Sequence, residues 1–463
     1  MKEELLKRLV PHGQEHLLAF WDELDPSDRT ALARQIDRID FDLIGRLFCH
    51  RDDQTDMGQI IDRAGPPPGV RLDPAENRFM PDQARQRGQE ALAAGQLGVI
   101  LVAGGQGTRL GFDHPKGMFS IGPVSGRPLF QIHVEKIIAL GRRHGVRIPL
   151  YLMTSPATHD ETVRFFADNG RFGLAAEDLT IFCQGTMPVI DAADGRVLLD
   201  QPGRVAVSPD GHGGMLAALG ASGALDDVRR RDIRQLFYFQ VDNPLVDVGS
   251  AELVGHHLLA GSELTSQVVA KTDWQKRVGN VVEVDRRLRV IEYSDLPDAA
   301  AKRLNPDGSL AIWAGSIAVH VIDAALLHRS IDDAEALPFH LARKKTAHVD
   351  ADGRRIEPTE PNAIKFERFI FDLIPSAEGA IVVEIDPSEG FAPLKNASGA
   401  DEDTPEAVRA AMTAQHARWL QQAGAEVVDA VDVEICPLWA LDAEEVSQKG
   451  VQGTRVTESR YFC

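Results

Sequence analysis

Cysteine is scarce in this 463-residue chain, and its four cysteines, at positions 49, 183, 436 and 463, are far apart and form no Cys-x-x-Cys pair. Zinc sites and disulfide scaffolds need closely spaced cysteines, so neither is expected. Long apolar runs are also missing, and the opening stretch MKEELLKRLVPHG has acidic residues where a signal peptide has an apolar core. The sequence therefore predicts a reduced, cytoplasmic protein without a membrane partner.

Basic residues are outnumbered by acidic ones. The chain has 50 Lys and Arg against 69 Asp and Glu, a formal net charge of −19. Non-specific binding to nucleic acid depends on a basic surface, so no nucleic-acid partner is expected. An anionic small molecule is still compatible with this charge, because a cleft lined by a few cations creates its own local field.

The length of the chain, with 43% hydrophobic residues, is too great for one ordinary domain. Residues 1–80 are expected to form a helical N-terminal region, because Leu5, Leu6 and Leu9 recur at helical spacing and the stretch GPPPG ends regular structure. Residues 81–380 are predicted to form the central catalytic domain. Residues 381–463 are predicted to form a small C-terminal α+β domain.

Strands and helices alternate in the central region. Apolar runs such as VILVA, IPLYLMTS, LTIFCQ and LFYFQVD are separated by helical stretches, including LFQIHVEKIIALGRRHG. Runs that are apolar on both faces indicate a mostly parallel, Rossmann-like α/β sheet flanked by helices. Ligands bind such sheets at the carboxyl ends of the strands, so Asp242 and the loop after VILVA are expected on one rim.

That loop lies within residues 101–119, LVAGGQGTRLGFDHPKGMF. Three kinds of phosphate-binding loop are the alternatives for it. A Walker A loop is absent, because Lys116 precedes Gly117 and no Ser or Thr follows the lysine. A dinucleotide fingerprint fits poorly, because its third glycine is displaced to Gly111, which disfavours a dehydrogenase. An anion nest of backbone N–H groups, with Arg109 and Lys116 as cations, fits best and suits several phosphates at once.

The stretch AGGQGTRLGFDHPKG resembles the signature of eukaryotic-type UDP-sugar pyrophosphorylases, above all the N-acetylglucosamine branch. Further blocks resemble the family in its order between about residues 99 and 400: MTSPATHDET, FCQGTMPVI, SPDGHGGMLAAL, QVDNPL, VIEYSDL, IWAGSIAVH, IKFERFIFDLI and FAPLKNA. The resemblance implies a nucleotidyltransferase (GT-A-like) fold. It also implies an enzyme that makes a UDP-sugar and pyrophosphate from UTP and a sugar 1-phosphate, most readily N-acetylglucosamine 1-phosphate.

The same resemblance implies roles for individual residues. Backbone at Ala103, Gly104 and Gly105 is expected to hold the nucleotide. Arg109, Lys116 and Lys395 are expected to act on phosphates, and Asp242 to bind Mg²⁺, a cation that prefers a few carboxylates with water and phosphate oxygens. Asp247 is interpreted as structural. The expected substrate contacts are Gln184 and Gly211 for uracil, Gly279 and Glu292 for the sugar, and Lys365 as a weaker candidate.

Two positions depart from the acetylglucosamine pattern. His212 stands where those enzymes usually have Asn, and glucose-type enzymes commonly have His there; it is expected to bind substrate as a hydrogen-bond donor rather than act as a base. Ser316 replaces the Asn of the usual Gly-Asn-Ile block, and its shorter side chain is expected to bind the sugar, with water as a possible bridge. The alternatives are therefore a UTP–glucose-1-phosphate or broad UDP-sugar pyrophosphorylase, or a non-catalytic UDP-sugar-binding protein. A monomer or weak homo-oligomer is expected.

Overall fold

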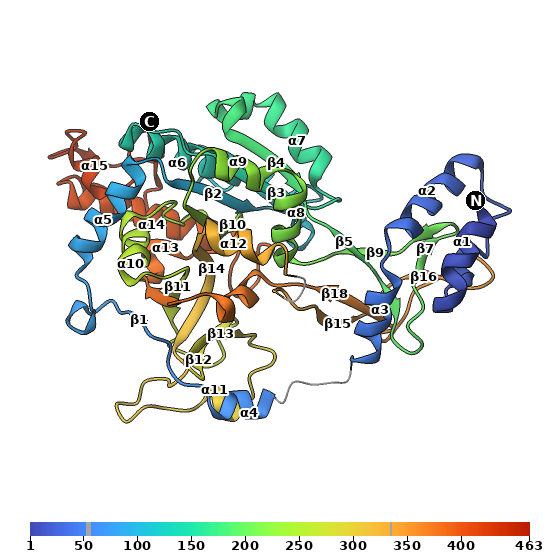
Figure 1. Ribbon diagram of the computed structural model, residues 1–463. Coiled ribbons are helices and arrows are strands. Elements are labelled where there is room, and N and C mark those ends of the chain that lie inside the picture. Colours follow the sequence, from blue (N-terminus) through green and yellow to red (C-terminus); the bar gives the residue numbers. More distant parts are fainter. Residues whose placement is uncertain (52–56, 334–335) are drawn as a thin grey trace. The chain divides into compact units, whose positions relative to one another are not determined.

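The computed structural model describes residues 1–51, 57–333 and 336–463. Contacts between residues group the chain into two compact units (Figure 1). Each unit has its own hydrophobic core. The division into residues 1–80, 81–380 and 381–463 stays a prediction, since the compact units join segments far apart in sequence. The smaller unit consists of Met1–Met57, Gln184–Met215 and Leu337–Asp372, and the larger unit of Gly58–Cys183, Leu216–Ala336 and Leu373–Cys463.

A ten-stranded sheet forms the centre of the larger unit. The eight strands of its main path are mostly parallel to one another, which confirms the predicted α/β class. In spatial order these strands are β1 (Gly69–Val70), β19 (Ile381–Glu384), β11 (Leu264–Ala270), β14 (Ala314–Asp323), β10 (Gln235–Gln240), β2 (Leu97–Val102), β3 (Leu150–Thr154) and β4 (Leu179–Cys183).

Strand β14 is the exception to the parallel arrangement. It runs antiparallel to both of its long neighbours, β10 and β11, and it was not predicted as a strand from the stretch IWAGSIAVH. A hairpin of β12 (Asn280–Val284) and β13 (Arg287–Ile291) extends from it, because β12 pairs with the start of β14. Two antiparallel steps leave β10 and β11 parallel, so the carboxyl ends of the other main strands still share one edge.

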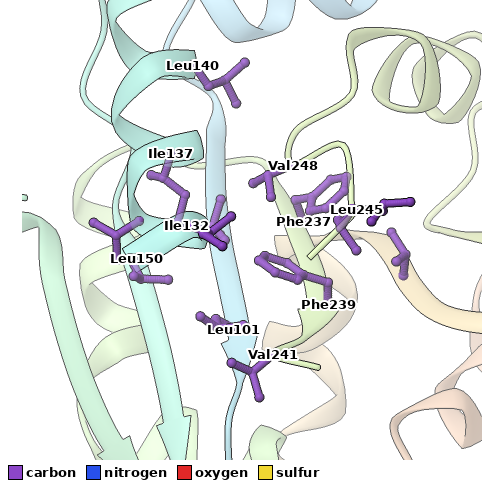
Figure 2. Close-up of a cluster of buried hydrophobic side chains, with 14 of the residues drawn as sticks. Leu101, Ile132, Ile137, Leu140, Leu150, Phe237, Phe239, Val241, Leu245 and Val248 are labelled. Carbon is purple, nitrogen blue, oxygen red and sulfur yellow. The ribbon is translucent and has the colours of Figure 1, made fainter. Parts of the chain in front are cut away.

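Side chains of the central strands pack against helix α6 (Leu129–His144) to form the main core (Figure 2). All six residues of β2 are buried, as expected for a strand covered on both faces. Figure 2 shows Leu101, Phe237 and Phe239 of the sheet beneath Ile132 and neighbouring residues of α6. A rigid core directly behind the strand ends fixes the loops that follow them.

Helices α5 (Pro81–Ala93) and α10 (Ala251–Ala260) pack unusually closely. A Cβ on Gly88 would lie 1.8 Å from the Ala251 carbonyl oxygen, and one on Gly255 would lie 1.6 Å from that of Ala84. Only glycine permits this backbone approach. The other helices of the larger unit are α4 (Met57–Asp62), α7 (His159–Asp168), α8 (Met215–Ala221), α9 (Ala224–Arg230), α11 (Asp298–Ala301), α12 (Ala324–Ser330) and α13 (Pro387–Gly390).

The end of the chain adds α14 (Pro405–Gln422) and α15 (Ala443–Ser447) to the larger unit. They pack with short strands around a separate cluster of buried residues that includes Leu420, Val433 and Phe462. The long helix and the strand-like pieces predicted here are confirmed. The strands are β20 (Glu426–Val427), β21 (Val433–Ile435), β22 (Arg455–Val456) and β23 (Arg460–Phe462).

The smaller unit packs α1 (Lys2–Leu9), α2 (Pro26–Arg38) and α3 (Phe41–Cys49) on short strands. Asp25 caps α2 by accepting from the backbone N–H groups of Ser27 and Asp28, as the Asp-Pro-Ser-Asp pattern suggests. The strands are β5 (Thr186–Pro188), β6 (Ile190–Asp191), β7 (Leu199–Gln201), β8 (Arg204–Val205), β9 (Val207–Pro209), β15 (His340–Lys344), β16 (His348–Val349), β17 (Arg355–Ile356) and β18 (Ala363–Glu367). Within the described ranges, no helix of either unit combines the length and apolar character needed to cross a membrane.

Candidate active site

The glycine loop and Asp242 leave the central sheet at the same edge. Strands β2 and β10 are parallel neighbours, with Val102 opposite Gln240 at their ends, and the Val241 N–H donates to the Val102 carbonyl over 3.0 Å. The loop begins at Ala103 and Asp242 follows one residue after Val241. The predicted placement on one rim is confirmed.

The glycine loop is held by its own backbone hydrogen bonds. Lys116 N–H donates to the Gly105 carbonyl over 3.0 Å, and Gly107 N–H donates to the His114 carbonyl over 2.8 Å. Gly111 has a φ of +70°, a left-handed conformation that favours glycine. Gly117 lies against the ring of Phe130, where a Cβ would approach to 2.3 Å. The loop therefore returns on itself and brings Lys116 back beside its own beginning.

Three consecutive backbone N–H groups in this loop, those of Gly104, Gly105 and Gln106, have no acceptor among the described residues. A Cβ on Gly105 would meet no protein atom within 4 Å, so the space above it is open. The Gly104 carbonyl is turned away and accepts from the Ser155 hydroxyl over 2.7 Å. Adjacent free N–H groups beside open space form an anion-binding nest, as predicted from the sequence. The run begins one residue later than expected, because the Ala103 N–H donates to the Met153 carbonyl over 2.8 Å.

Lys116 supplies a fixed positive charge at this rim. Its Nζ lies 3.4 Å from Asp242 Oδ2 and donates to the Leu394 carbonyl over 3.2 Å. The two charged side chains are only 17% and 13% exposed, so solvent screens their interaction less than at an open surface. The backbone of Leu394 also donates to the Asp242 carbonyl over 2.8 Å, which fixes the segment before Lys395 to the same rim.

Arg109 is exposed, and its guanidinium has no protein partner in the part of the chain that the structure describes. It is therefore free to form a bidentate contact with phosphate oxygens. Lys395 is partly buried, and its backbone N–H donates to the Asp403 carbonyl over 2.9 Å. Both cations predicted to accompany Lys116 thus lie in the larger unit.

Asp403 is a carboxylate that the sequence analysis missed. Its φ of +58° is unusual for a residue other than glycine. Burial raises the pKa of the Asp403 carboxyl, Lys395 lowers it, and the negative charges of Glu402 and Asp242 raise it further. Asp403 therefore lies within electrostatic reach of Asp242. The only sequence signal was its place eight residues after Lys395, in an acidic run that resembles a solvated loop.

The carboxylates at this rim suit Mg²⁺ better than a transition metal. No group of three or more His, Cys, Asp or Glu side chains suited to a metal ion occurs among the described residues. Mg²⁺ commonly binds one or two carboxylates and completes its octahedron with phosphate oxygens and water. Asp242, with Asp403 nearby, fits that donor set, whereas a zinc site would need four protein ligands or three with an open position.

The three residues predicted to contact the sugar lie together in the larger unit. Ser316 N–H donates to the Gly279 carbonyl over 2.8 Å, which joins β14 to the residue before β12. A Cβ on Gly279 would lie 3.6 Å from Glu292 Oε1 and 3.9 Å from Ser316 Cβ. Glu292 and Ser316 therefore approach the same point above Gly279, at ordinary contact distance, whereas a Cβ there would clash with Val290 Cγ1 at 2.8 Å.

Beside this group lies a buried polar pair that the sequence analysis also missed. Lys271 Nζ donates to Asn280 Oδ1 over 2.6 Å, and Asn280 Nδ2 donates to the Ile291 carbonyl over 3.2 Å. Burial lowers the pKa of Lys271, and Asp273 opposes this effect. A polar residue at the end of an apolar strand, as in LTSQVVAK, was the available signal. The pair fixes the hairpin that carries Glu292.

The predicted uracil contacts lie in the smaller unit. Gln184 is 8% exposed, and its amide has no hydrogen-bond partner in the described ranges. The amide atoms are not among the fully buried unpaired atoms, so the amide keeps some accessible surface on which a ligand or water can pair with it. Gly211 has a φ of +82°, and a Cβ there would lie 2.4 Å from the Arg368 carbonyl oxygen. Position 211 therefore requires glycine for two independent reasons.

His212 is held as a neutral imidazole. Burial, with a smaller contribution from the charge of His340, lowers its pKa to about 4. Its Nδ1 accepts from the Ile370 N–H over 3.3 Å, so the remaining proton lies on Nε2, which is a donor. The rings of Phe369 and Phe371 pack against it at centroid distances of 5.2 and 5.6 Å. This geometry agrees with the expectation of a hydrogen-bond donor rather than a base.

An Asp210–Arg368 ion pair holds the loop that carries Gly211 and His212. Arg368 Nη2 lies 3.0 Å from Asp210 Oδ2, and burial raises the pKa of Asp210 while Arg368 opposes this. The Arg368 N–H also donates to the Asp210 carbonyl, and the Gly213 N–H to the Arg368 carbonyl, both over 2.8 Å. The sequence analysis missed this pair, since the two residues are 158 positions apart.

Two further predicted residues are placed as follows. Lys365 lies on β18 and is partly buried, and the described residues include no ion pair between it and Glu367. Asp247 lies in the larger unit and is exposed, although desolvation of its carboxyl raises its pKa while Ser250 and Lys136 oppose that shift. The structural interpretation of Asp247 stays a prediction.

The site combines an anion nest with a Lys–Asp pair at the carboxyl edge of a mostly parallel sheet. This arrangement places the chain among nucleotide-binding α/β enzymes. A family model described as "UTP--glucose-1-phosphate uridylyltransferase" matches residues 62–450. The chain belongs to this family of uridylyltransferases, which confirms the resemblance stated from the sequence.

Relatives and solved structures agree with this assignment. The chain is 34% identical over 457 residues to the UDP-N-acetylglucosamine pyrophosphorylase of Saccharomyces cerevisiae, and the match covers 95% of both chains. It is 36% identical over 448 residues to UDP-N-acetylhexosamine pyrophosphorylase-like protein 1 of Homo sapiens, with 93% and 87% covered. The crystal structure of the Trypanosoma brucei uridine diphosphate N-acetylglucosamine pyrophosphorylase matches with a TM-score of 0.83 at 25% identity, covering 97% and 94%.

Proposed function

We propose that this protein transfers a uridylyl group from UTP to a sugar 1-phosphate and releases pyrophosphate, with N-acetylglucosamine 1-phosphate as the preferred acceptor. The observation that carries the proposal is the run of free N–H groups at Gly104–Gln106 beside Lys116. Membership of a uridylyltransferase family supports the reaction. The names of the yeast and trypanosome proteins support the sugar.

The reaction needs charge neutralisation more than proton transfer. An oxygen of the sugar phosphate attacks the α-phosphorus of UTP, and the bond to the bridging α–β oxygen breaks. Pyrophosphate leaves with that electron pair, and no proton is removed, because the attacking phosphate is already ionised. Two anions repel each other as they approach, so positioned cations and N–H donors account for most of the catalysis.

The glycine loop and its neighbours are suited to that task. The N–H groups of Gly104, Gly105 and Gln106, next to buried Ala103, are proposed to hold the triphosphate. Arg109 and Lys116 are proposed to bind its oxygens, and Lys116 to stabilise the charge that develops during transfer. Lys395 is proposed to bind the bridging phosphates, since the segment that carries it is hydrogen-bonded to Asp242.

Asp242 is the proposed carboxylate ligand of Mg²⁺, with Asp403 as its neighbour. When bound, Mg²⁺ would neutralise negative charge on phosphate oxygens. Lys116 orients the Asp242 carboxylate through the 3.4 Å ion pair. Removing Asp242 should therefore change the metal requirement without removing the binding site for the nucleotide.

The base and the sugar are assigned to separate groups. Gln184 is proposed to read the uracil edge, because an amide offers both a donor and an acceptor, and Gly211 to admit the base next to its backbone. Glu292, Gly279 and Ser316 are proposed to bind the sugar hydroxyls. His212 is proposed to donate from Nε2, and Lys365 is kept as an additional substrate-binding cation.

A glucose-type or broad specificity is the second candidate, because His212 and Ser316 depart from the acetylglucosamine pattern. A panel of N-acetylglucosamine, glucose and galactose 1-phosphates, each with UTP and Mg²⁺, separates the candidates by pyrophosphate release. Preference for the acetylated sugar supports the proposal, and preference for glucose 1-phosphate favours the second candidate. UDP-sugar binding without turnover would favour the non-catalytic alternative. We also propose a cytoplasmic monomer or weak homo-oligomer, which fluorescence microscopy and sedimentation velocity test.

A further inference from the structure

A cavity of about 440 Å³ lies at the edge of the central sheet opposite the candidate active site. Its wall includes residues 68–70, at the start of β1, and Ala377, Gly379, Ala380 and Ile381, at the start of β19. Both strands run parallel to β11, which the two antiparallel steps through β14 make parallel to β10 and β2. The cavity is thus at the amino-end edge of the sheet, whereas the candidate active site is at its carboxyl-end edge.

Helix α10 provides the polar interior of this cavity. His256 on α10 lines it and is fully buried, and neither ring nitrogen has a hydrogen-bond partner among the described residues. Burial lowers the pKa of His256, with Glu252 opposing. A neutral imidazole offers one donor and one acceptor, and buried polar groups in folded proteins are normally paired. The ring nitrogens have almost no accessible surface, so a ligand in the cavity reaches them only when the ring or the cavity wall moves.

Positive charge surrounds the cavity. Arg78, Arg286 and Arg287 line it, against the single carboxylate of Glu283. Arg78 and Arg286 are exposed, and Arg286 has no partner in the described part of the chain. Arg287 is anchored by a hydrogen bond to the Pro375 carbonyl. In a chain of net charge −19, a concentration of guanidinium groups around one concave site favours an anion.

The rest of the wall is apolar and includes Val70, Phe79, Leu288 and Ile381. A volume of about 440 Å³ is within the range of small-molecule sites, which combine apolar walls with a few polar groups. We propose that this cavity binds a small organic anion, with its phosphate or carboxylate group on the arginines and its apolar or aromatic body inside, hydrogen-bonded to His256.

The proposal does not depend on the uridylyltransferase assignment. None of the residues named for UTP, the sugar or Mg²⁺ lines this cavity. The cavity is at the amino ends of β1 and β19, whereas the glycine loop follows the carboxyl end of β2, so a ligand here would not block the glycine loop. A failed test here therefore leaves the proposed reaction unaffected, and a failed activity assay leaves this proposal unaffected.

Calorimetric titration of the full-length protein with 1-naphthyl phosphate, 1-naphthoate, inorganic phosphate and neutral 1-naphthol tests the proposal. The two organic anions are expected to bind at least tenfold more tightly than inorganic phosphate or naphthol, and their ranking distinguishes phosphate from carboxylate. In parallel, NMR of histidine-labelled protein follows the His256 ring, assigned by its loss in His256→Asn. That signal is expected to shift on binding.

Surface variants protect the test against misfolding of His256→Asn. Arg286→Ala is expected to weaken binding about tenfold. Arg289→Ala is the matched control, because Arg289 is exposed on the same hairpin but does not line the cavity, and it should leave affinity unchanged. Lys116→Ala should also bind the probe normally. The proposal is overturned if no organic anion binds, if binding leaves the His256 signal unmoved, or if Arg286→Ala and Arg289→Ala have equal effects.

Discussion

Replacing Lys116 with alanine is expected to slow uridylyl transfer while the protein stays folded. The ammonium group is held in place by two contacts, 3.4 Å to Asp242 and 3.2 Å to the Leu394 carbonyl. It therefore needs no rearrangement to meet the charge that develops as pyrophosphate departs. The variant loses that charge and also leaves Asp242 without its cation beside two anionic substrates.

The expected size of the effect follows from these two losses. Removing one preorganised donor from a developing oxyanion typically lowers the rate by a factor of about 100 to 1,000, or about 2.7–4 kcal/mol. At 3.4 Å and an effective dielectric constant of about 20, two unit charges interact with about 5 kcal/mol. We therefore expect kcat/KM to fall by about 1,000-fold, at the upper end of that range.

The assay is the initial rate of pyrophosphate release at saturating Mg²⁺, with circular dichroism and thermal unfolding as tests of folding. Lys302→Ala is a matched control, since Lys302 is an exposed lysine of the same unit, paired with Asp298, and its loss should leave kcat/KM unchanged. Lys116→Arg retains the charge and should keep more activity than the alanine variant. A Lys116→Ala protein with kcat/KM within about threefold of wild type would refute the assigned role.

Three more predictions concern the metal, the base and pH. Asp242→Ala should raise the Mg²⁺ concentration for half-maximal rate at least about tenfold in a metal titration; an unchanged titration contradicts the metal assignment. In Gly211→Ala the new Cβ would lie 2.4 Å from the Arg368 carbonyl oxygen, so the loop that carries residue 211 must shift. The KM for UTP should therefore rise, and a normal KM contradicts the proposed contact between Gly211 and the base. The folded pKa of His212 is about 4, against 6.5 unfolded, so the unfolded state binds the proton first. The free energy of unfolding should therefore fall by about 2 kcal/mol between pH 6.5 and 4.5 because of His212. In urea unfolding, His212→Asn should lack that part of the loss. If the variant loses as much stability as the wild type, His212 is not held as a neutral imidazole.

Local sequence patterns were sufficient for strands β2, β3, β4, β10 and β11 and for the glycine loop, whereas β1 and β19 were not predicted in the central sheet. Residues 97–102 are apolar at every position except Gly98, which is the pattern of a strand buried on both faces. The loop's glycines are explained by local geometry, as at Gly111 with its positive φ. Features that depend on neighbours in sequence were therefore predictable.

Features that depend on distant neighbours were not. The direction of β14 is set by its pairing with β10 and β11, and nothing within residues 314–323 encodes it. The Asp210–Arg368 pair joins segments 158 positions apart, and each residue alone resembles a solvated charge. Gly279, Glu292 and Ser316 were named through the family resemblance, but the registers of β12 with β13 and with β14 explain why they lie together.

A crystal structure of the protein with UTP bound most directly tests the central claim, that the loop of residues 103–117 binds the nucleotide's phosphates. The account predicts phosphate oxygens within hydrogen-bond distance of the N–H groups of Gly104, Gly105 and Gln106, with Lys116 Nζ on the triphosphate. A UTP molecule bound elsewhere, with those three N–H groups still without an acceptor, would contradict it.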